Sequence, residues 1–339
     1  MIFQNIEFYN VDELAPFLGG WQLNRYPKQV RQHMIPGAYR AEMAGGCEIR
    51  FVTEAPKASV TLSANEREGE VVVYRGDYFH SIHRLQAGAI QTITLEDNPY
   101  FGTVRSEDRI ETRYSGKLWR IFSCDFRLAF YHLESYGFGH RPPAEDEAPR
   151  LRWLAYGSSI TTGSGATHTA HGYIHQAARR LRADVLNKGL PGACMCEPEV
   201  ADYLADRNDW DLITLEIGVN MRGSVSSEEF ERRADYLIRR VTSAHPSKPV
   251  VVLTIFPNFS TYEKNESISG VREAKYNGIL RRLVQELDLP NLRLLEGTAI
   301  LTDFSGLTAD LIHPSDFGHT LMGENLADAL SDIIGVDLV

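Results

Sequence analysis

The stretch Leu151-Arg-Trp-Leu-Ala-Tyr-Gly-Ser-Ser-Ile-Thr-Thr-Gly163 joins a mostly apolar run to a turn rich in glycine and hydroxyl side chains. Residues 151–156 have the length and composition of a buried strand, and the turn at 157–163 follows at once. A strand that runs through a tight turn into a helix is typical of parallel α/β sheets, which bind ligands at the carboxyl ends of their strands. We therefore expect functional side chains in this turn and after the next strands.

Strand and helix patterns alternate through the rest of the sequence. Predicted strands cover residues 183–187, 212–217, 250–255 and 292–295, and predicted helices cover residues 172–181, 197–204, 227–244, 271–287 and 319–334. This alternation predicts an α/β domain over residues 151–339, with a parallel sheet and helices on both of its faces.

The pattern before residue 139 is different. Short β-rich runs, broken by turns, lie at residues 48–53, 59–63, 70–74, 78–82, 90–95 and 119–133. Several of them alternate polar with apolar residues, as half-buried antiparallel strands do. They predict a jelly-roll-like β-sandwich over residues 1–138. Residues 139–150 are rich in proline and charge, which predicts a linker between the two domains.

Composition limits the classes of partner. The chain has 339 residues, enough for two domains, and its net charge of −10 disfavours nucleic acid. It has no apolar run near the roughly 20 residues of a membrane span, and its N-terminus does not resemble a signal peptide. We expect a cytoplasmic protein with no nucleic-acid or membrane partner, although a secreted chain already processed would look the same. The four cysteines lack zinc-site spacing and are interpreted as reduced thiols.

Ser159 is the candidate nucleophile. A serine at a strand-to-helix junction is exposed at the sheet edge, and the helix start favours developing negative charge. A phosphate loop and a plain helix cap are the alternatives. The sequence lacks both the Gly-Lys pattern of phosphate loops and the Gly-x-Ser-x-Gly turn of α/β-hydrolases.

Asp310 and His313 supply the other groups of a nucleophilic site. A carboxylate three residues before a histidine can bind its Nδ1 and leave Nε2 free to take a proton from a serine. A His-Pro turn with a surface aspartate is the alternative interpretation. Gly192 and Asn220 follow two further predicted strands and could donate hydrogen bonds to an oxyanion, although each could also be a routine turn residue.

Together these residues resemble the SGNH, or GDSL-type, hydrolase superfamily. Ser159 falls on its nucleophile, Gly192 and Asn220 on its oxyanion-hole donors, and Asp310 with His313 on its Asp-x-x-His pair. Ser158 departs from the commoner Gly-Asp-Ser pattern. The segment Gly157-Ser-Ser-Ile-Thr161 resembles a subgroup that often carries an N-terminal β-sandwich. The resemblance implies a flavodoxin-like, three-layer fold for the catalytic domain.

The resemblance implies a serine-dependent carboxylic-ester hydrolase. We expect it to remove short acyl groups, acetyl above all, from an acetylated sugar or another small polar molecule. An acyltransferase with the same acyl-serine intermediate and a binding protein with a decayed site are the alternatives. No cofactor is implied, and no metal, because the His171 and His175 pair lacks an obvious third ligand. Arg222 is interpreted as part of a surface salt bridge, with anion binding as the alternative. A homo-oligomer is compatible with the sequence.

Overall fold

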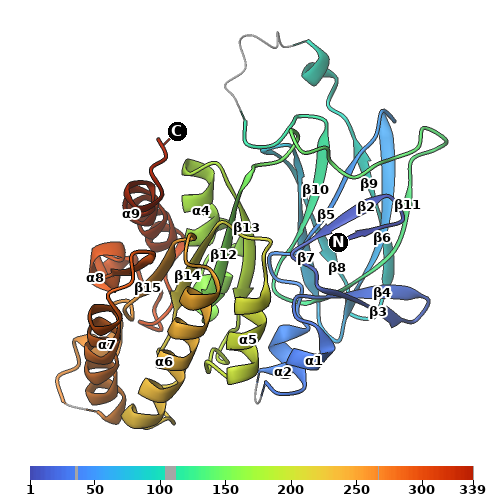
Figure 1. Ribbon diagram of the computed structural model, residues 1–339. Coiled ribbons are helices and arrows are strands. Elements are labelled where there is room, and N and C mark those ends of the chain that lie inside the picture. The colour runs from blue at the N-terminus through green and yellow to red at the C-terminus, as the bar shows by residue number, and fades with distance from the viewer. Residues whose placement is uncertain (35–36, 104–111, 266, 339) are drawn as a thin grey trace. The chain divides into compact units, whose positions relative to one another are not determined.

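The protein is described from a computed structural model that covers residues 1–34, 37–103, 112–265 and 267–338 (Figure 1). Its residues cluster into two units. The first comprises Met1–Pro27 and Ala41–Arg150, and the second comprises Lys28–Arg40 and Leu151–Val339.

The first unit contains two antiparallel sheets. One sheet has the strand order β1 (Ile2–Phe3), β2 (Ile6–Tyr9), β5 (Glu48–Val52), β10 (Leu118–Ser123), β7 (Gly69–Arg75) and β8 (Tyr78–Leu85). The other has the order β3 (Glu13–Phe17), β4 (Gly20–Asn24), β11 (Arg127–Glu134), β6 (Lys57–Asn65) and β9 (Ile90–Glu96). A single apolar core contains Ile49 and Val73 from the first sheet and Leu62 and Phe130 from the second. The predicted β-sandwich is therefore confirmed.

Two details of the sandwich differ from the sequence prediction. The run at residues 119–133 is not one strand, because a turn separates β10 from β11 and the Phe126 amide there donates to the Cys124 carbonyl at 2.9 Å. Strands β1 to β4 were not predicted. Residues 139–150 lie in the first unit, where Arg141 and Val52 exchange two backbone hydrogen bonds of 3.0 and 2.8 Å. The linker and the domain boundaries stay predictions.

The second unit is built on a parallel sheet. Its strands are β12 (Leu151–Gly157), β13 (Ala183–Gly189), β14 (Leu212–Glu216), β15 (Val250–Leu253) and β16 (Leu292–Leu295), in the spatial order β13-β12-β14-β15-β16. This is the 2-1-3-4-5 order of flavodoxin-like folds, whose switch point lies between the first and third strands. The predicted α/β class is confirmed, and the carboxyl ends of β12, β13 and β14 lie side by side.

Helices cover both faces of this sheet (Figure 1). Helices α4 (Tyr173–Arg180) and α9 (Asp316–Ile334) pack together, and their apolar residues join a core with Trp153 and Val251. On the other face, α6 (Ser227–Ala244) packs between α5 (Pro198–Asp206) and α7 (Ile268–Leu287). The short helices are α1 (Lys28–Arg31), α2 (Ala38–Ala41), α3 (Ser159–Thr162) and α8 (Gly297–Ile300), and four 3-10 turns are η1 (Pro99–Gly102), η3 (Thr169–His171), η4 (Phe259–Thr261) and η5 (Phe304–Gly306).

A short N-terminal segment belongs to the second unit. Helix α1 packs on α5, and His33 Nδ1 lies 3.7 Å from Glu199 Oε1. Gly37 also lies close to Ala193, since a Cβ built at Gly37 would stand 3.5 Å from the Ala193 Cβ. Residues 28–34 and 37–40 therefore pack against the chain that follows β13.

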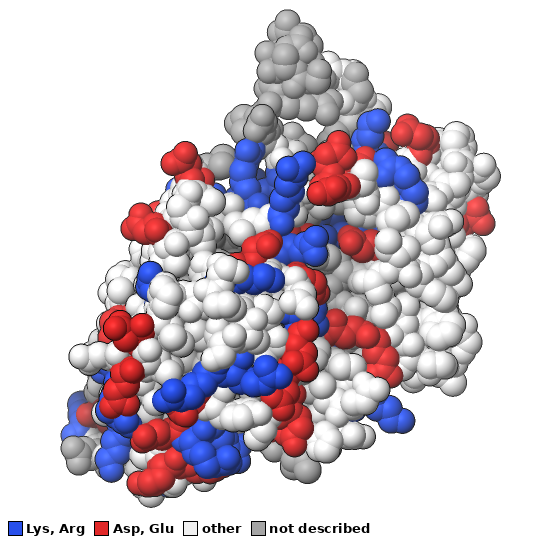
Figure 2. Space-filling model, in the orientation of Figure 1, with Lys and Arg blue, Asp and Glu red and all other residues white. Residues whose placement is uncertain are grey.

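The surface carries both signs of charge. On the face drawn in Figure 2, Lys and Arg side chains are interspersed with Asp and Glu side chains. None of the helices in the described ranges combines the length and the apolar content needed to cross a membrane. The predicted cytoplasmic location and the predicted lack of nucleic-acid and membrane partners stay predictions.

Candidate active site

Ser159 lies at the first position of α3, separated from the end of β12 by Ser158 alone. Ser158 adopts an extended backbone and caps this short helix, because its Oγ accepts a hydrogen bond from the Ile160 amide at 3.1 Å. Helix α3 ends at Gly163, whose φ of 101° is in the left-handed region. Only 7% of the Ser159 surface is exposed. The turn therefore holds Ser159 in one conformation at the carboxyl end of the sheet.

His313 and Asp310 meet Ser159 from the other end of the unit. They lie in the loop between η5 and α9. Ser159 Oγ is 2.8 Å from His313 Nε2, and His313 Nδ1 is 2.7 Å from Asp310 Oδ2. Since an ionised aspartate can only accept a hydrogen bond, Nδ1 carries the proton and Nε2 is left to accept the Ser159 hydroxyl.

Asp310 is held by several donors in addition to His313. Its Oδ1 accepts the amides of Ile312 and His313 at 2.8 and 2.9 Å and the Thr308 hydroxyl at 2.8 Å. Burial raises the pKa of Asp310, but the hydrogen bonds from His313, Ile312 and Thr308 outweigh it and hold that pKa well below its usual range. Asp310 is therefore a fixed anion beside the imidazole.

A second histidine, which sequence analysis did not single out, organises the loop beside His313. The buried His319 accepts the Tyr173 amide at Nδ1 (3.1 Å) and donates from Nε2 to the Ser164 carbonyl (3.0 Å). Burial lowers the pKa of His319 to about 4, so its ring is neutral near pH 7. Gly165, which follows Ser164, packs against the His313 loop. A Cβ at Gly165 would overlap the Pro314 carbonyl oxygen and stand 3.0 Å from the His313 Cβ.

Gly192 and Asn220 lie in the loops after β13 and β14, the strands on either side of β12. A hydrogen bond of 3.1 Å from the Cys194 amide to Asn220 Oδ1 joins these loops and fixes the Asn220 carboxamide. Within the described ranges, no residue accepts a hydrogen bond from the amides of Ser159 and Gly192 or from Asn220 Nδ2. Three donors on neighbouring loops thus remain available for a ligand oxygen.

The arrangement has the groups that acyl transfer needs. It contains a hydroxyl bonded to an imidazole, a carboxylate that fixes the tautomer of that imidazole, and donors with no acceptor of their own. The structure joins Ser159, His313 and Asp310 by direct hydrogen bonds, and it places Gly192 and Asn220 on the loops of the adjacent strands.

Arg222 does not lie on the surface. It is 6% exposed, forms an ion pair with the buried Glu273, and donates to Asn258 Oδ1 at 2.7 Å. The expectation of a salt bridge is correct, but its place at the surface is wrong, because Arg222 enters the interior beside α7. Among the described residues, no three His, Cys, Asp or Glu side chains gather as metal ligands would.

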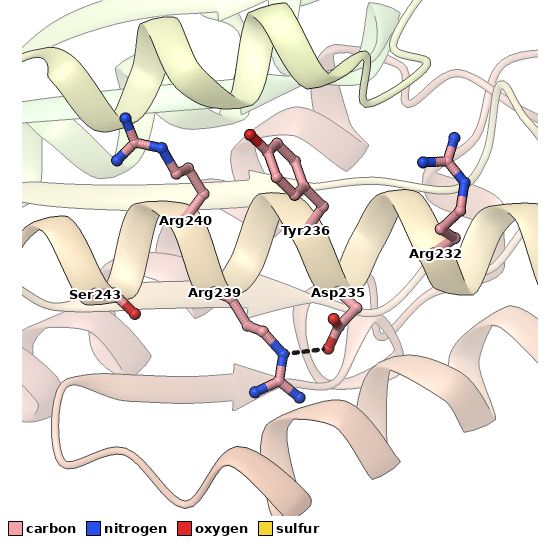
Figure 3. A pocket seen from close by; sticks show the side chains of 6 residues that line it. All are labelled: Arg232, Asp235, Tyr236, Arg239, Arg240 and Ser243. Atoms are coloured by element: carbon pink, nitrogen blue, oxygen red, sulfur yellow. Dashed lines mark hydrogen bonds and ion pairs between the residues drawn. The ribbon is translucent and has the colours of Figure 1, made fainter.

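An open pocket of about 460 Å³ lies elsewhere on this unit (Figure 3). All the residues that line it belong to α6: Arg232, Asp235, Tyr236, Arg239, Arg240 and Ser243. Arg239 pairs with Asp235 at 2.7 Å, and Arg240 pairs with Asp202 at 2.8 Å. The cations of this pocket are already neutralised, and the pocket contains none of the candidate catalytic residues.

Comparison with known proteins gives a family match and several similar folds. Residues 155–321 match the model of the GDSL-like lipase/acylhydrolase family. A search of curated proteins finds no match. The solved structure of the salicylyl-acyltransferase SsfX3 from a tetracycline biosynthetic pathway is similar over 98% of this chain and 95% of its own, with a TM-score of 0.80 and 16% identity.

Two esterase structures are also similar. A family two carbohydrate esterase from Clostridium thermocellum, in complex with cellohexaose, matches over 97% of this chain and 99% of its own, with a TM-score of 0.63 and 14% identity. The acetyl xylan esterase Est2A from the rumen bacterium Butyrivibrio proteoclasticus matches over 86% and 92%, with a TM-score of 0.56 and 12% identity. At such low identity these likenesses establish the fold alone.

Proposed function

The second unit of this chain belongs to the GDSL-like lipase/acylhydrolase family, and on that premise we propose that the protein is a serine-dependent carboxylic-ester hydrolase. The observation that carries the proposal is the pair of hydrogen bonds from Ser159 Oγ to His313 Nε2 (2.8 Å) and from His313 Nδ1 to Asp310 Oδ2 (2.7 Å). This is the geometry of an activated nucleophile, because each group is oriented by the next.

The first half of the proposed reaction acylates Ser159. Ser159 Oγ attacks the carbonyl carbon of the ester while its proton moves to His313 Nε2, and the carbonyl π electrons move onto the oxygen. Asp310 stabilises the imidazolium that forms. The resulting oxyanion accepts hydrogen bonds from the amides of Ser159 and Gly192 and from Asn220 Nδ2. When the tetrahedral intermediate collapses, the alcohol leaves with the proton from His313.

The second half frees the enzyme. A water molecule attacks the acyl-serine carbonyl and gives its proton to His313 Nε2. Collapse of the second tetrahedral intermediate breaks the bond to Ser159 Oγ, which recovers the proton, and releases the carboxylic acid. If an alcohol attacked in place of water, the reaction would be an acyl transfer to that alcohol.

We propose short acyl groups, with acetyl first, and a carbohydrate or another small polar molecule as the alcohol part. Two observations support this choice. The fold resembles that of a carbohydrate esterase bound to cellohexaose and that of an acetyl xylan esterase. The sequence also lacks an apolar stretch that could form a lid over a long acyl chain. Neither a metal nor an organic cofactor is required by the proposed steps.

The first experiment compares hydrolysis of p-nitrophenyl acetate, butyrate and octanoate by the wild type and by Ser159→Ala. We expect turnover of acetate that falls with chain length and is lost in the variant. Added alcohols then test whether the acyl group goes to water or to an acceptor. A wild type inactive on all three esters would contradict the proposed esterase, and activity retained by Ser159→Ala would exclude Ser159 as the nucleophile.

The rate should also depend on the protonation of His313. Because only the neutral imidazole accepts the Ser159 proton, kcat/KM is expected to be lower in acid than at neutral pH. The measurement is a pH profile with p-nitrophenyl acetate under conditions in which chemistry limits the rate. A rate that does not fall in acid would argue against His313 as the base.

A further inference from the structure

A buried carboxyl group contacts the turn that carries Ser159. Glu216, the last residue of β14, is 1% exposed. Its Oε2 accepts three hydrogen bonds: from the Ser158 amide at 2.7 Å, from the Ser158 hydroxyl at 2.6 Å and from the Thr161 hydroxyl at 3.1 Å. Two of these donors belong to the residue that precedes Ser159.

The turn is shaped to admit this carboxyl group. A Cβ built at Gly157 would lie 2.7 Å from Glu216 Oε2 and 2.9 Å from Glu216 Cβ, and it would overlap Thr161 Oγ1. Only glycine therefore leaves room for the glutamate at this point of the turn. The close approach explains why the sequence has glycine before Ser158, independently of any requirement for an unusual backbone angle.

The hydrogen bonds continue from Glu216 to the site. The Ser158 hydroxyl, which donates to Glu216, accepts the Ile160 amide and so caps α3. The Thr161 hydroxyl, which also donates to Glu216, lies 3.0 Å from the Tyr173 hydroxyl. The orientation of the first turn of α3 thus depends on one carboxyl oxygen, and Ser159 lies between the two residues that bind it.

Among the described residues, no Lys or Arg side chain forms an ion pair with Glu216, and none forms a hydrogen bond with its buried Oε1. Burial raises the pKa of this carboxyl group to about 7. An uncompensated buried carboxyl group costs stability. Packing alone does not explain why a carboxyl group is buried here at this cost. The three hydrogen bonds to Oε2, in contrast, all come from Ser158 and Thr161, the residues on either side of the Ser159 turn.

We propose that Glu216 is a positioning residue for Ser159, holding Ser158 and Thr161 so that Ser159 Oγ faces His313 and the Ser159 amide faces the oxyanion. The inference rests on the proposed hydrolase function. The commoner family pattern has an aspartate at the position of Ser158, so in this chain a carboxyl group from the neighbouring strand β14 contacts the residue that replaces it.

The test measures the reactivity of Ser159 apart from folding. Glu216→Met keeps the length of the side chain and removes the acceptor, whereas Glu216→Gln keeps a neutral acceptor. We expect Glu216→Met to lower kcat for p-nitrophenyl acetate about 100-fold with KM within about threefold, and Glu216→Gln to restore about a tenth of the wild-type kcat or more. Labelling of Ser159 by a fluorophosphonate should slow in parallel, measured on protein whose thermal unfolding is still cooperative.

Ser158→Ala keeps the test decisive if Glu216→Met folds poorly, because it removes one of the bonds to Oε2 and should itself lower kcat. Where Glu216→Met folds, adding Ser158→Ala to it should lower kcat by no more than about threefold further, since that bond is already lost. Asp211→Asn is the matched control, because Asp211 accepts the Arg152 amide (2.8 Å) at the opposite ends of β12 and β14, and it should leave kcat unchanged.

Three outcomes would overturn the inference: wild-type kcat in Glu216→Met or in Ser158→Ala, effects of Ser158→Ala and Glu216→Met that multiply, or a loss in Asp211→Asn as large as that in Glu216→Met. Each of these leaves the proposed hydrolase function intact. A wild type that neither hydrolyses esters nor labels at Ser159 overturns both together.

Discussion

Two buried glutamates, one in each unit, have opposite surroundings. Glu48 in the sandwich accepts hydrogen bonds from Arg120 at 2.5 and 2.8 Å and from Arg50 at 2.7 Å. Glu216 in the α/β unit instead accepts hydrogen bonds from uncharged donors, the Ser158 amide and the hydroxyl groups of Ser158 and Thr161. Burial raises the pKa of both, but at Glu48 the two guanidinium groups outweigh burial and hold the pKa far below its usual range.

The buried polar groups of the two units differ in whether they have partners of opposite charge. In the sandwich, the buried carboxylate and its cations satisfy one another. Around Ser159, Glu216 Oε1 is left without a partner, and the Ser159 amide and Asn220 Nδ2 have no acceptor among the described residues. We therefore expect substitutions at Glu48 and its arginines to change stability, and substitutions around Ser159 to change activity.

The largest expected effect is that of Glu48→Gln on stability. The substitution removes the carboxylate that Arg50 and Arg120 both bind at 2.8 Å or less. The other carboxylates near them are more distant, Glu7 at 3.5 Å from Arg50 and Asp77 at 3.9 Å from Arg120, so the expected loss is about 3 kcal/mol of unfolding free energy. Urea unfolding of the full chain measures it. Glu70→Gln is the control, because its partner Arg84 is exposed and the loss should be about 0–1 kcal/mol. Equal effects of the two substitutions would remove the contrast between the units.

The next effect concerns activity. Asn220→Ala should lower kcat about 100-fold to 1000-fold by removing an oxyanion donor, with only about 1 kcal/mol lost in stability from the Cys194 amide. Asn220→Asp keeps the acceptor for Cys194 but places a negative charge near the oxyanion, so it should be at least as inactive. Unchanged turnover in Asn220→Ala would remove Asn220 from the proposed site.

The pH dependence of stability separates the two glutamates further. Glu216 titrates near 4.5 when unfolded and at about 7 when folded, so between these values the folded protein binds more protons. Its contribution to the unfolding free energy therefore falls as pH rises, by at most about 3 kcal/mol. In Glu216→Gln the unfolding free energy should no longer decrease in this way between about pH 5 and about pH 7.5. Urea unfolding at the two pH values measures it. Parallel curves of unfolding free energy against pH for wild type and Glu216→Gln would contradict the raised pKa. For Glu48 the sign is reversed, since its stabilisation is lost in acid.

The smallest effect is expected at the pocket on α6. Arg239→Ala breaks an exposed pair with Asp235 and should change stability by about 0.5 kcal/mol or less, with no change in kcat. Thermal unfolding and the p-nitrophenyl acetate assay check both. A tenfold loss of activity would mean that this surface contributes to function after all.

The sequence was most informative where chemistry and periodicity coincide. Ser159, Asp310 and His313 lie in short motifs after predicted strands, and helix α6 and strand β16 have the predicted bounds. Helix α9 begins three residues before the predicted start, at Asp316, because Ser315 caps it through the Gly318 amide. That cap was readable from the residue type.

Other features depended on tertiary structure. Strands β1 and β2 are short, and the turn between them has positive φ at Gln4 and Asn5, so no long alternating run marks them. Glu216 closes an apolar strand, a position that ordinarily faces solvent, and nothing in the sequence shows that the strand end is covered. His319 lies within the helix pattern of α9, where its two backbone partners, 146 and 155 residues away, are invisible to local analysis.

The separation of Ser159 from His313 also has a consequence for synthesis. The two residues are 154 positions apart, so a ribosome adding about 5–20 residues per second makes His313 roughly 8–30 s after Ser159. Strands β13 to β16 are synthesised during that interval, while Ser159 still lacks its proposed general base. If the proposed mechanism holds, the nascent chain cannot activate Ser159 in that interval, and esterase activity is expected only once the segment before α9 contacts α3.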